Sequence, residues 1–266
     1  MKMILISWIT FTLLNCRNIS IQSENYKCNK DIIEQKYIIN GAWKYGIYEP
    51  QFQMYLDSAI YYCPTLASAY QQKAMAFFKC KNYTKGEYYI NIACELSGEY
   101  FDYRAFMVCI FSRDYETASN LFISLINERG DNHIMDHKYS FYLGLCYIQL
   151  LQLDKAKTIF IKLTENTTPH YLDYFYLGVI YYNLFEFDKA KICFQKSIVE
   201  YSQFSDAYFY LAKIDENNLE FEGRKTKLKL SKELLLNRYT INEDNAKYEF
   251  YPYQVNIDMI NWELDR

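Results

Sequence analysis

The stretch FYLGVIYYNLFEFDKAKICF, from Phe175 to Phe194, decides the fold because a close copy of it occurs earlier in the chain. The stretch FYLGLCYIQLLQLDKAKTIF, from Phe141 to Phe160, aligns with it without a gap at an offset of 34 residues. A third copy, FYLAKIDENN, begins at Phe209, which is another 34 residues along. Self-similarity at a fixed spacing of roughly 20–50 residues is typical of repeat architectures. The sequence therefore predicts a stack of similar units.

Each copy has the apolar pattern of a helical hairpin. Leu177 and Tyr181 lie one turn apart on the first expected helix, and Ala190 and Phe194 share a stripe on the second. Gly178 is small, so the two helices can approach closely there and leave room for the phenyl ring of Phe194. A single hairpin cannot bury its outer faces, so neighbouring hairpins must cover them.

This pattern resembles the tetratricopeptide repeat, a pair of antiparallel helices. The matching residues in one copy are Tyr174, Leu177, Gly178, Tyr181, Ala190, Phe194 and Ser197, and in the other Leu143, Gly144, Tyr147, Ala156, Phe160 and Leu163. The resemblance implies an all-α, right-handed α-solenoid of about six hairpins. We place them at residues 33–66, 67–100, 101–136, 137–170, 171–204 and 205–238. In the third unit the turn between the helices is about two residues short, and about four extra residues follow within ERGDNHIMD.

The flanking segments complete the domain organisation. Residues 1–16 are expected to be a signal peptide and residues 17–32 a linker, and residues 239–266 follow the array. Val255, Ile257 and Trp262 give this last segment too much apolar surface for a free tail. We expect it to cap the last repeat, since terminal units need their exposed face covered.

Composition agrees with long helices and tight turns. The 266 residues include only 8 glycines and 4 prolines, and 51% are apolar. A net charge of -3 gives no reason to expect nucleic acid as a partner. Lysine and arginine gather once, in Gly223–Arg238. We interpret this run as a solvated helix face, and contact with anionic lipid heads is the alternative.

The N-terminus reads as a targeting signal. After Lys2, an apolar stretch of roughly 12 residues leads to Cys16, too short to span a bilayer as a helix. Leu13-Leu14-Asn15-Cys16 resembles the lipobox of bacterial lipoproteins, with Asn15 in place of the usual small residue. The resemblance implies lipidation of Cys16 and, because Arg17 follows, an outer-membrane location facing the periplasm. A cleaved signal that leaves a secreted or periplasmic protein is the alternative. Tyr55–Ala67 and Arg113–Ala118 also resemble stretches of Bacteroidetes tetratricopeptide lipoproteins.

In the family that the repeats resemble, the first helices line a concave groove. By that resemblance, the groove residues are Tyr37, Phe141, Leu145, Ile148, Phe175, Val179, Tyr182 and Phe209. These side chains are apolar or aromatic, which favours an extended or helical apolar peptide as the partner. The alternative is that the array buries this face against itself or against the C-terminal segment.

Few residues point to catalysis, and we expect neither an enzyme nor a bound cofactor. His133 and His137 lie four apart in DNHIMDHK and are weak candidates for a metal site, with a polar surface loop as the alternative. With Cys16 lipidated, seven of the eight cysteines remain, an odd number that cannot all pair. Most of them, including the helical Cys94, Cys109, Cys146 and Cys193, are expected to be buried thiols. We expect Cys28, which lies outside the repeats, to be the one that is reactive or bridged.

Two functions follow from these features. The first is a non-enzymatic protein–protein interaction scaffold tethered to the bacterial cell envelope by a lipid anchor, with a protein or peptide partner. The second is an outer-membrane lipoprotein that binds a glycan or small ligand through stacked aromatic rings. A continuous Phe/Leu stripe favours the first, and we adopt it as our prediction.

Overall fold

The computed structural model describes residues 28–266. The predicted signal peptide and Cys16 lie outside the described residues. Within residues 28–266, six helical hairpins follow one another, which confirms the predicted all-α solenoid. They are α1 (Lys30–Ile33) continued by η1 (Glu34–Ile39) with α2 (Pro50–Tyr62); α3 (Ala67–Lys79) with α4 (Tyr83–Leu96); α5 (Phe101–Met107) continued by η4 (Val108–Ser112) with α6 (Tyr115–Arg129); α7 (Tyr139–Gln149) with α8 (Leu153–Thr164); α9 (Tyr171–Asn183) with α10 (Phe187–Glu200); and α11 (Ser205–Asn217) with α12 (Phe221–Leu236).

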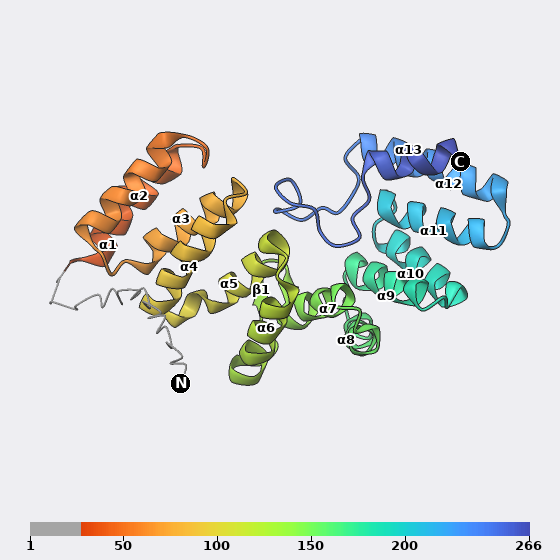
Figure 1. Cartoon of the computed structure of the whole chain (residues 1–266), viewed down its shortest axis with the longest axis horizontal. Helices are drawn as coiled ribbons and strands as arrows, with labels where there is room; N and C mark the ends of the chain where they lie inside the picture. Colours follow the sequence, from red (N-terminus) through yellow and green to blue (C-terminus); the bar gives the residue numbers. More distant parts are fainter. Residues whose placement is uncertain (1–27) are drawn as a thin grey trace, which may run out of the picture.

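The hairpins are arranged around an arc, with α1 and α2 at one end and α11 to α13 at the other (Figure 1). Short 3-10 turns, η2 (Ala42–Lys44) and η3 (Gly98–Tyr100), lie in the N-terminal half, and α13 (Ile257–Asp265) ends the chain. Between α12 and α13, residues 239–256 form no helix and loop into the hollow of the arc (Figure 1). We call residues 239–256 the C-terminal strap. None of the helices within residues 28–266 has the length and apolar character needed to cross a membrane.

Close approach of paired helices depends on glycine at the repeated small position. A Cβ placed on Gly178 would lie 2.7 Å from the Phe194 ring, and one on Gly144 would lie 2.6 Å from the Phe160 ring. Both distances are well below van der Waals contact, so a larger residue would push the two helices apart. The 34-residue spacing of the sequence thus corresponds to a repeated packing contact.

The turns inside the second to sixth hairpins each use a left-handed residue that is not glycine. In the fourth hairpin Leu151 has φ 57°, and the backbone N–H groups of Leu151 and Gln152 donate to the carbonyls of Ile148 and Tyr147. These bonds satisfy carbonyls at the end of α7. The equivalent left-handed residues in the other turns are Lys81, Arg113, Phe185 and Leu219.

The third hairpin departs from the others as its sequence predicts. The end of its first helix, η4, is π-helical, and only Arg113 and Asp114 separate it from α6. The extra residues after α6 form a small antiparallel ribbon, β1 (His133–Ile134) and β2 (His137–Lys138), in which Ile134 pairs with His137. This ribbon carries His137 toward the inside of the arc.

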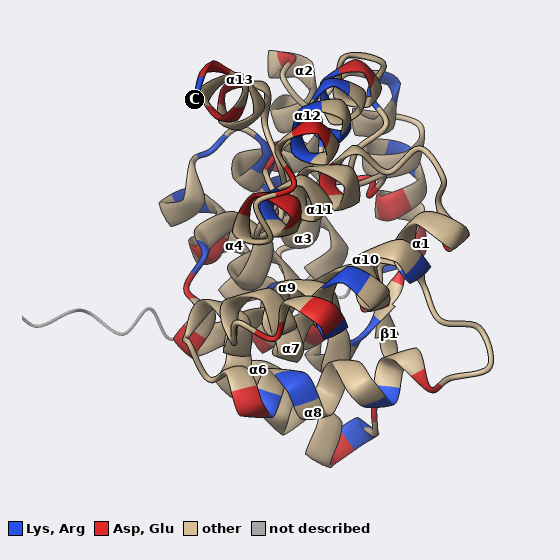
Figure 2. Cartoon of the chain, turned by 90° about the vertical axis from the view of Figure 1, so that its right-hand side faces the viewer, with Lys and Arg blue, Asp and Glu red and all other residues tan. Residues whose placement is uncertain are grey.

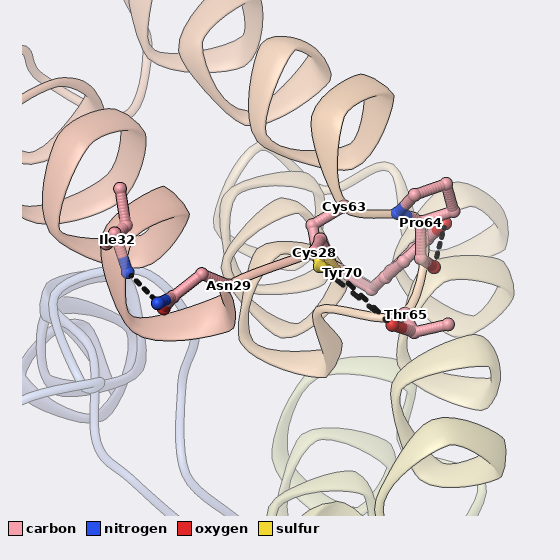
Figure 3. The surroundings of a disulfide bond; sticks show 7 residues. All are labelled: Cys28, Asn29, Ile32, Cys63, Pro64, Thr65 and Tyr70. Carbon is pink, nitrogen blue, oxygen red and sulfur yellow. Dashed lines mark hydrogen bonds between the residues drawn. A yellow bond between two sulfur atoms is a disulfide. The ribbon is translucent and has the colours of Figure 1, made fainter. Parts of the chain in front are cut away.

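The core has two parts. A small cluster that includes Phe52, Leu56 and Cys63 holds the first hairpin against α3, whereas a large cluster runs from Tyr70 to Ile260. A disulfide between Cys28 and Cys63 ties the start of the described chain to the end of α2 (Figure 3). The predicted bridging of Cys28 is therefore confirmed, and Cys94, Cys109, Cys146 and Cys193 are buried thiols as expected.

The basic run on α12 is only partly solvated. Basic and acidic residues alternate over many helices, and α12 carries several of the basic ones (Figure 2). Lys225 and Lys229 are exposed, but Lys227 forms an ion pair with Asp215 and Arg224 forms one with Glu263 of α13. The prediction of a solvated face is wrong for Arg224, which is largely covered and binds the C-terminal helix, whereas Lys227 remains partly exposed while it pairs with the buried Asp215.

Candidate functional site

The C-terminal strap lies on the first helices of the last repeats and is bound through both its backbone and its side chains. The Tyr176 hydroxyl donates to the carbonyl of Pro252 at 3.0 Å, and the Tyr210 hydroxyl donates to the carbonyl of Tyr253 at 3.3 Å. Tyrosines at this repeated position, on α9 and α11, therefore satisfy consecutive carbonyls of the strap. These contacts use carbonyl groups, which the main chain of any peptide offers.

Asp206, at the start of α11, accepts hydrogen bonds from both ends of the strap. Its Oδ1 accepts from the backbone N–H of Val255 at 2.7 Å, and its Oδ2 accepts from the Thr240 hydroxyl at 2.8 Å. The side chain is completely buried. Burial raises the pKa of Asp206 to about 7, although these two hydrogen bonds oppose the shift.

The tip of the strap reaches back to the second and third hairpins through Glu249. One carboxylate oxygen accepts from the Arg113 guanidinium at 2.6 Å, and the other accepts from the Tyr83 hydroxyl at 2.8 Å. Arg113 also donates to the carbonyl of Phe250. Burial, followed by the hydrogen bond to Glu249, raises the pKa of Tyr83 to about 12. Lys81 Nζ lies 3.6 Å from the second carboxylate oxygen, so this carboxylate of the strap is bound by two cations and one phenol.

A second carboxylate of the strap, Glu243, meets two histidines. Its Oε1 lies 3.1 Å from Nε2 of His137, and both side chains are buried. The His170 ring, at the start of α9, lies 4.8 Å from the His137 ring. Burial and the neighbouring His137 lower the pKa of His170 to about 4. Burial by itself would raise the pKa of Glu243, but His137, together with the neighbouring His170 and Asp136, outweighs burial and lowers it.

The helix at the end of the chain packs on the last repeat. Glu263 of α13 accepts from Lys213 of α11 at 2.7 Å and from Arg224 of α12 at 2.7 Å. α13 therefore covers the last hairpin. The strap before it covers the side of the earlier hairpins that faces the hollow of the arc, which we call the inner face.

The residues expected to line an open groove are found between hairpins. Phe141 packs among Phe160 and Tyr176, and Phe175 packs among Phe194 and Tyr210. Six of the eight are buried, namely Phe141, Leu145, Ile148, Phe175, Val179 and Phe209, whereas Tyr37 and Tyr182 are half-buried. They do not line an open groove in this structure, so their contact with a partner stays a prediction.

Two tyrosines that contact the strap, Tyr176 and Tyr210, lie one position further along the first helices than the predicted phenylalanines. Tyr142, Tyr176 and Tyr210 directly follow the three predicted phenylalanines and repeat at the same 34-residue spacing. One residue corresponds to a rotation of about 100° around a helix, which separates the inter-hairpin face from the inner face. The repeated Phe-Tyr pair was therefore a signal in the sequence for the inner face.

The structure separates the two histidines that the sequence placed together. His133 is exposed on β1, where it pairs with Lys138, whereas His137 is buried and meets His170 and Glu243. Sequence reasoning missed His170 and Glu243 because neither lies near His137 along the chain. Only the folded strap brings the three groups together.

Comparison with known proteins places the fold. The tetratricopeptide repeat family model matches residues 139–166 and 174–203, which are the fourth and fifth hairpins. No curated protein matched the sequence.

Among solved structures, PilF of Pseudomonas aeruginosa superposes with a TM-score of 0.60 at 15% identity, covering 80% of this chain and 97% of that chain. A chain of the APC/C hetero-tetramer Cut9–Hcn1 gives 0.58 at 13% identity and covers 81% and 39%. MamA of Desulfovibrio magneticus RS-1 gives 0.51 at 14% identity and covers 66% and 97%. These likenesses show that the fold is a tetratricopeptide-repeat solenoid.

Proposed function

We propose that the chain is a non-enzymatic protein–protein interaction scaffold whose inner face binds a non-helical segment of a partner protein. The observation that carries the proposal is that this face already holds a non-helical, turn-containing segment, the strap, through tyrosine hydroxyls and hydrogen bonds to its backbone. The tetratricopeptide-repeat fold supports an interaction role, because stacked repeats create extended concave surfaces.

The contacts of the strap indicate the chemistry of the partner. Tyr176 and Tyr210 donate to carbonyls, which any peptide offers, whereas Arg113 and Tyr83 select a carboxylate. A partner segment with an acidic residue at that place would make the same contacts. The strap occupies this surface and therefore competes with the partner, so binding requires that the strap be displaced.

The proposed location is the bacterial outer membrane, facing the periplasm, through a lipid on Cys16. The lipobox-like sequence before Cys16 supports this part of the proposal. Replacement of Cys16 by Ser is expected to abolish incorporation of a palmitate analogue and to release the protein from the membrane fraction. Retention of the label in the Cys16→Ser variant would exclude the anchor.

A fluorescent peptide with the sequence of residues 239–256 tests whether the inner face can bind a separate segment. We expect it to bind weakly to the wild-type chain and at least about tenfold more tightly to a Glu249→Lys chain, whose own strap is repelled by Arg113. A peptide with the Glu249→Lys change should not bind the Glu249→Lys chain more tightly than it binds wild type, because the peptide lacks the carboxylate that Arg113 binds. Asp265→Lys, an exposed charge reversal on α13, is the matched control and should behave as wild type. Equal peptide affinity for all three folded chains would refute the proposal.

A cavity favours small-ligand binding as a second candidate function. It has a volume of about 710 Å³ and lies between the end of α12 and the strap. Leu235, Leu236, Ile241, Phe250 and Val255 contribute to its lining. This volume is within the range of about 300–1,000 Å³ found for ligand sites, and the apolar lining favours an apolar molecule over a glycan. Fluorescence of an apolar dye, compared between wild type and Ile241→Asp, tests this candidate.

A further inference from the structure

His137, His170 and Glu243 come from three separate parts of the fold and converge on one point. His137 is on β2, His170 precedes α9, and Glu243 is on the strap. One ligand atom from each lies within 4.8 Å of the others. We propose that these three side chains form a binding site for a divalent transition metal of the zinc class.

The types of donor select the metal. Two imidazole nitrogens and one carboxylate oxygen form the three-ligand set of many zinc sites, in which water is the fourth ligand. Magnesium and calcium prefer oxygen donors alone and do not suit two histidines. A cavity of about 310 Å³ adjoins the cluster and is lined by His137, His170, Asp136, Asp173 and Thr168, among others. It offers space for the water ligand and polar groups that bind it.

The geometry needs only a small contraction. Ligand atoms at about 2.0–2.1 Å from a tetrahedral zinc ion are separated from one another by about 3.3 Å. His137 Nε2 and Glu243 Oε1 are already 3.1 Å apart, so His170 is the ligand that must move closer. The His137 ring is stacked on Phe141, with ring centroids 3.8 Å apart, which fixes its orientation before a metal arrives.

The hydrogen bonding of His170 is compatible with ligation. Its Nδ1 accepts the backbone N–H of Leu172 at 3.4 Å, a long contact that contributes little. Ligation through Nε2 moves the ring proton to Nδ1 and ends this contact. Asp173 still accepts the backbone N–H of His170 at 2.8 Å, so the start of α9 remains capped.

Metal binding would join the strap to β2 and to α9 by one ion. Because Glu243 belongs to the strap, the metal would hold the strap on the inner face of the solenoid. The metal site itself does not depend on the identity of a partner.

Titration of the full chain with Co²⁺ tests the site, since tetrahedral Co²⁺ with nitrogen and oxygen ligands has strong visible bands. A Cys80→Ser background removes the thiol that is exposed within residues 28–266. We expect one equivalent of Co²⁺ to bind, and Zn²⁺ to displace it and to raise the melting temperature. His170→Asn should weaken binding at least about tenfold. Asparagine is a favoured helix cap, so this variant should keep its fold, as circular dichroism would verify.

His133→Asn is the matched control, because His133 borders the same cavity but is not among the three ligands. It should bind Co²⁺ as wild type does. Glu243→Gln is a second ligand variant, and it should also weaken binding. No tetrahedral spectrum in the wild type, or unchanged affinity in folded His170→Asn, would overturn the proposal. Loss of binding in His133→Asn would overturn it too, because the metal would then sit on the surface.

Discussion

The buried carboxyl of Asp206 is predicted to contribute less to the stability of the chain as the pH rises from 5 to 8, whereas His170, whose pKa is lowered to about 4, contributes more stability over the lower part of this range. The pKa of Asp206 is raised from 3.8 to about 7 in the folded chain, mainly by burial. A raised pKa means that the folded chain binds the proton more tightly, so the stabilisation is complete below pH 3.8 and is lost as the pH rises through 7. At about 1.4 kcal/mol per pKa unit, this amounts to about 4 kcal/mol, of which somewhat more than half falls between pH 5 and 8.

Asp206→Asn should remove this dependence while keeping the strap in place. The amide oxygen can accept from Val255 and the amide nitrogen can donate to Thr240, so both contacts of the neutral acid remain. Urea unfolding, followed by circular dichroism across this pH range, measures the free energy of unfolding of both chains. As the pH rises, the free energy of unfolding of Asp206→Asn should increase relative to that of wild type. Asp258→Asn, at an exposed position of α13, is the control and should follow wild type. Parallel profiles for Asp206→Asn and wild type would refute the reasoning.

Three further predictions concern packing, and urea unfolding at a fixed pH checks each. Tyr176→Phe should lower the free energy of unfolding by about 1–3 kcal/mol, because a strap carbonyl loses its donor. Tyr142→Phe should change it little, since that buried hydroxyl has no partner, and an equal loss in both variants would contradict the role of the strap. Gly178→Ala should lower the free energy of unfolding by about 1–3 kcal/mol, because the added methyl group would clash with the Phe194 ring. Gly98→Ala is the control and should leave the free energy of unfolding unchanged, because its methyl group would meet no atom closer than 4.0 Å. Leu151→Gly should raise the free energy of unfolding by up to about 1 kcal/mol, because glycine adopts φ 57° without strain, and a decrease would show that the exposed leucine contributes packing.

The repeat was predictable because its determinants recur at short range. Gly178 and Phe194 lie only 16 positions apart, as do Gly144 and Phe160, and both pairs follow the same pattern. The short turn before Asp114 and the extra residues of the β ribbon were also visible as departures from the 34-residue spacing. Local periodicity was enough for these features, since each hairpin contacts mainly its neighbours.

The candidate site was only partly predictable. Of the two candidate histidines, only His137 lies in the metal-like cluster, and its companions come from α9 and the strap. The weak consensus of the repeat does not specify how far each helix is rotated toward its neighbour. Phe141 and Phe175 therefore fill the space between hairpins, while Tyr176 contacts the strap.

The sequence by itself determined the repeating unit of this protein, which is a helical hairpin of 34 residues. It also indicated that glycine lies where paired helices touch and that cysteine side chains are buried between the helices. Only the tertiary structure decided what covers the inner face. Tyr83 and Glu249 are 166 positions apart, and His137 and Glu243 are 106 apart. Contacts at such separations leave no periodic trace in the sequence. They form because the hairpins curve into an arc that brings distant donors around one returning segment.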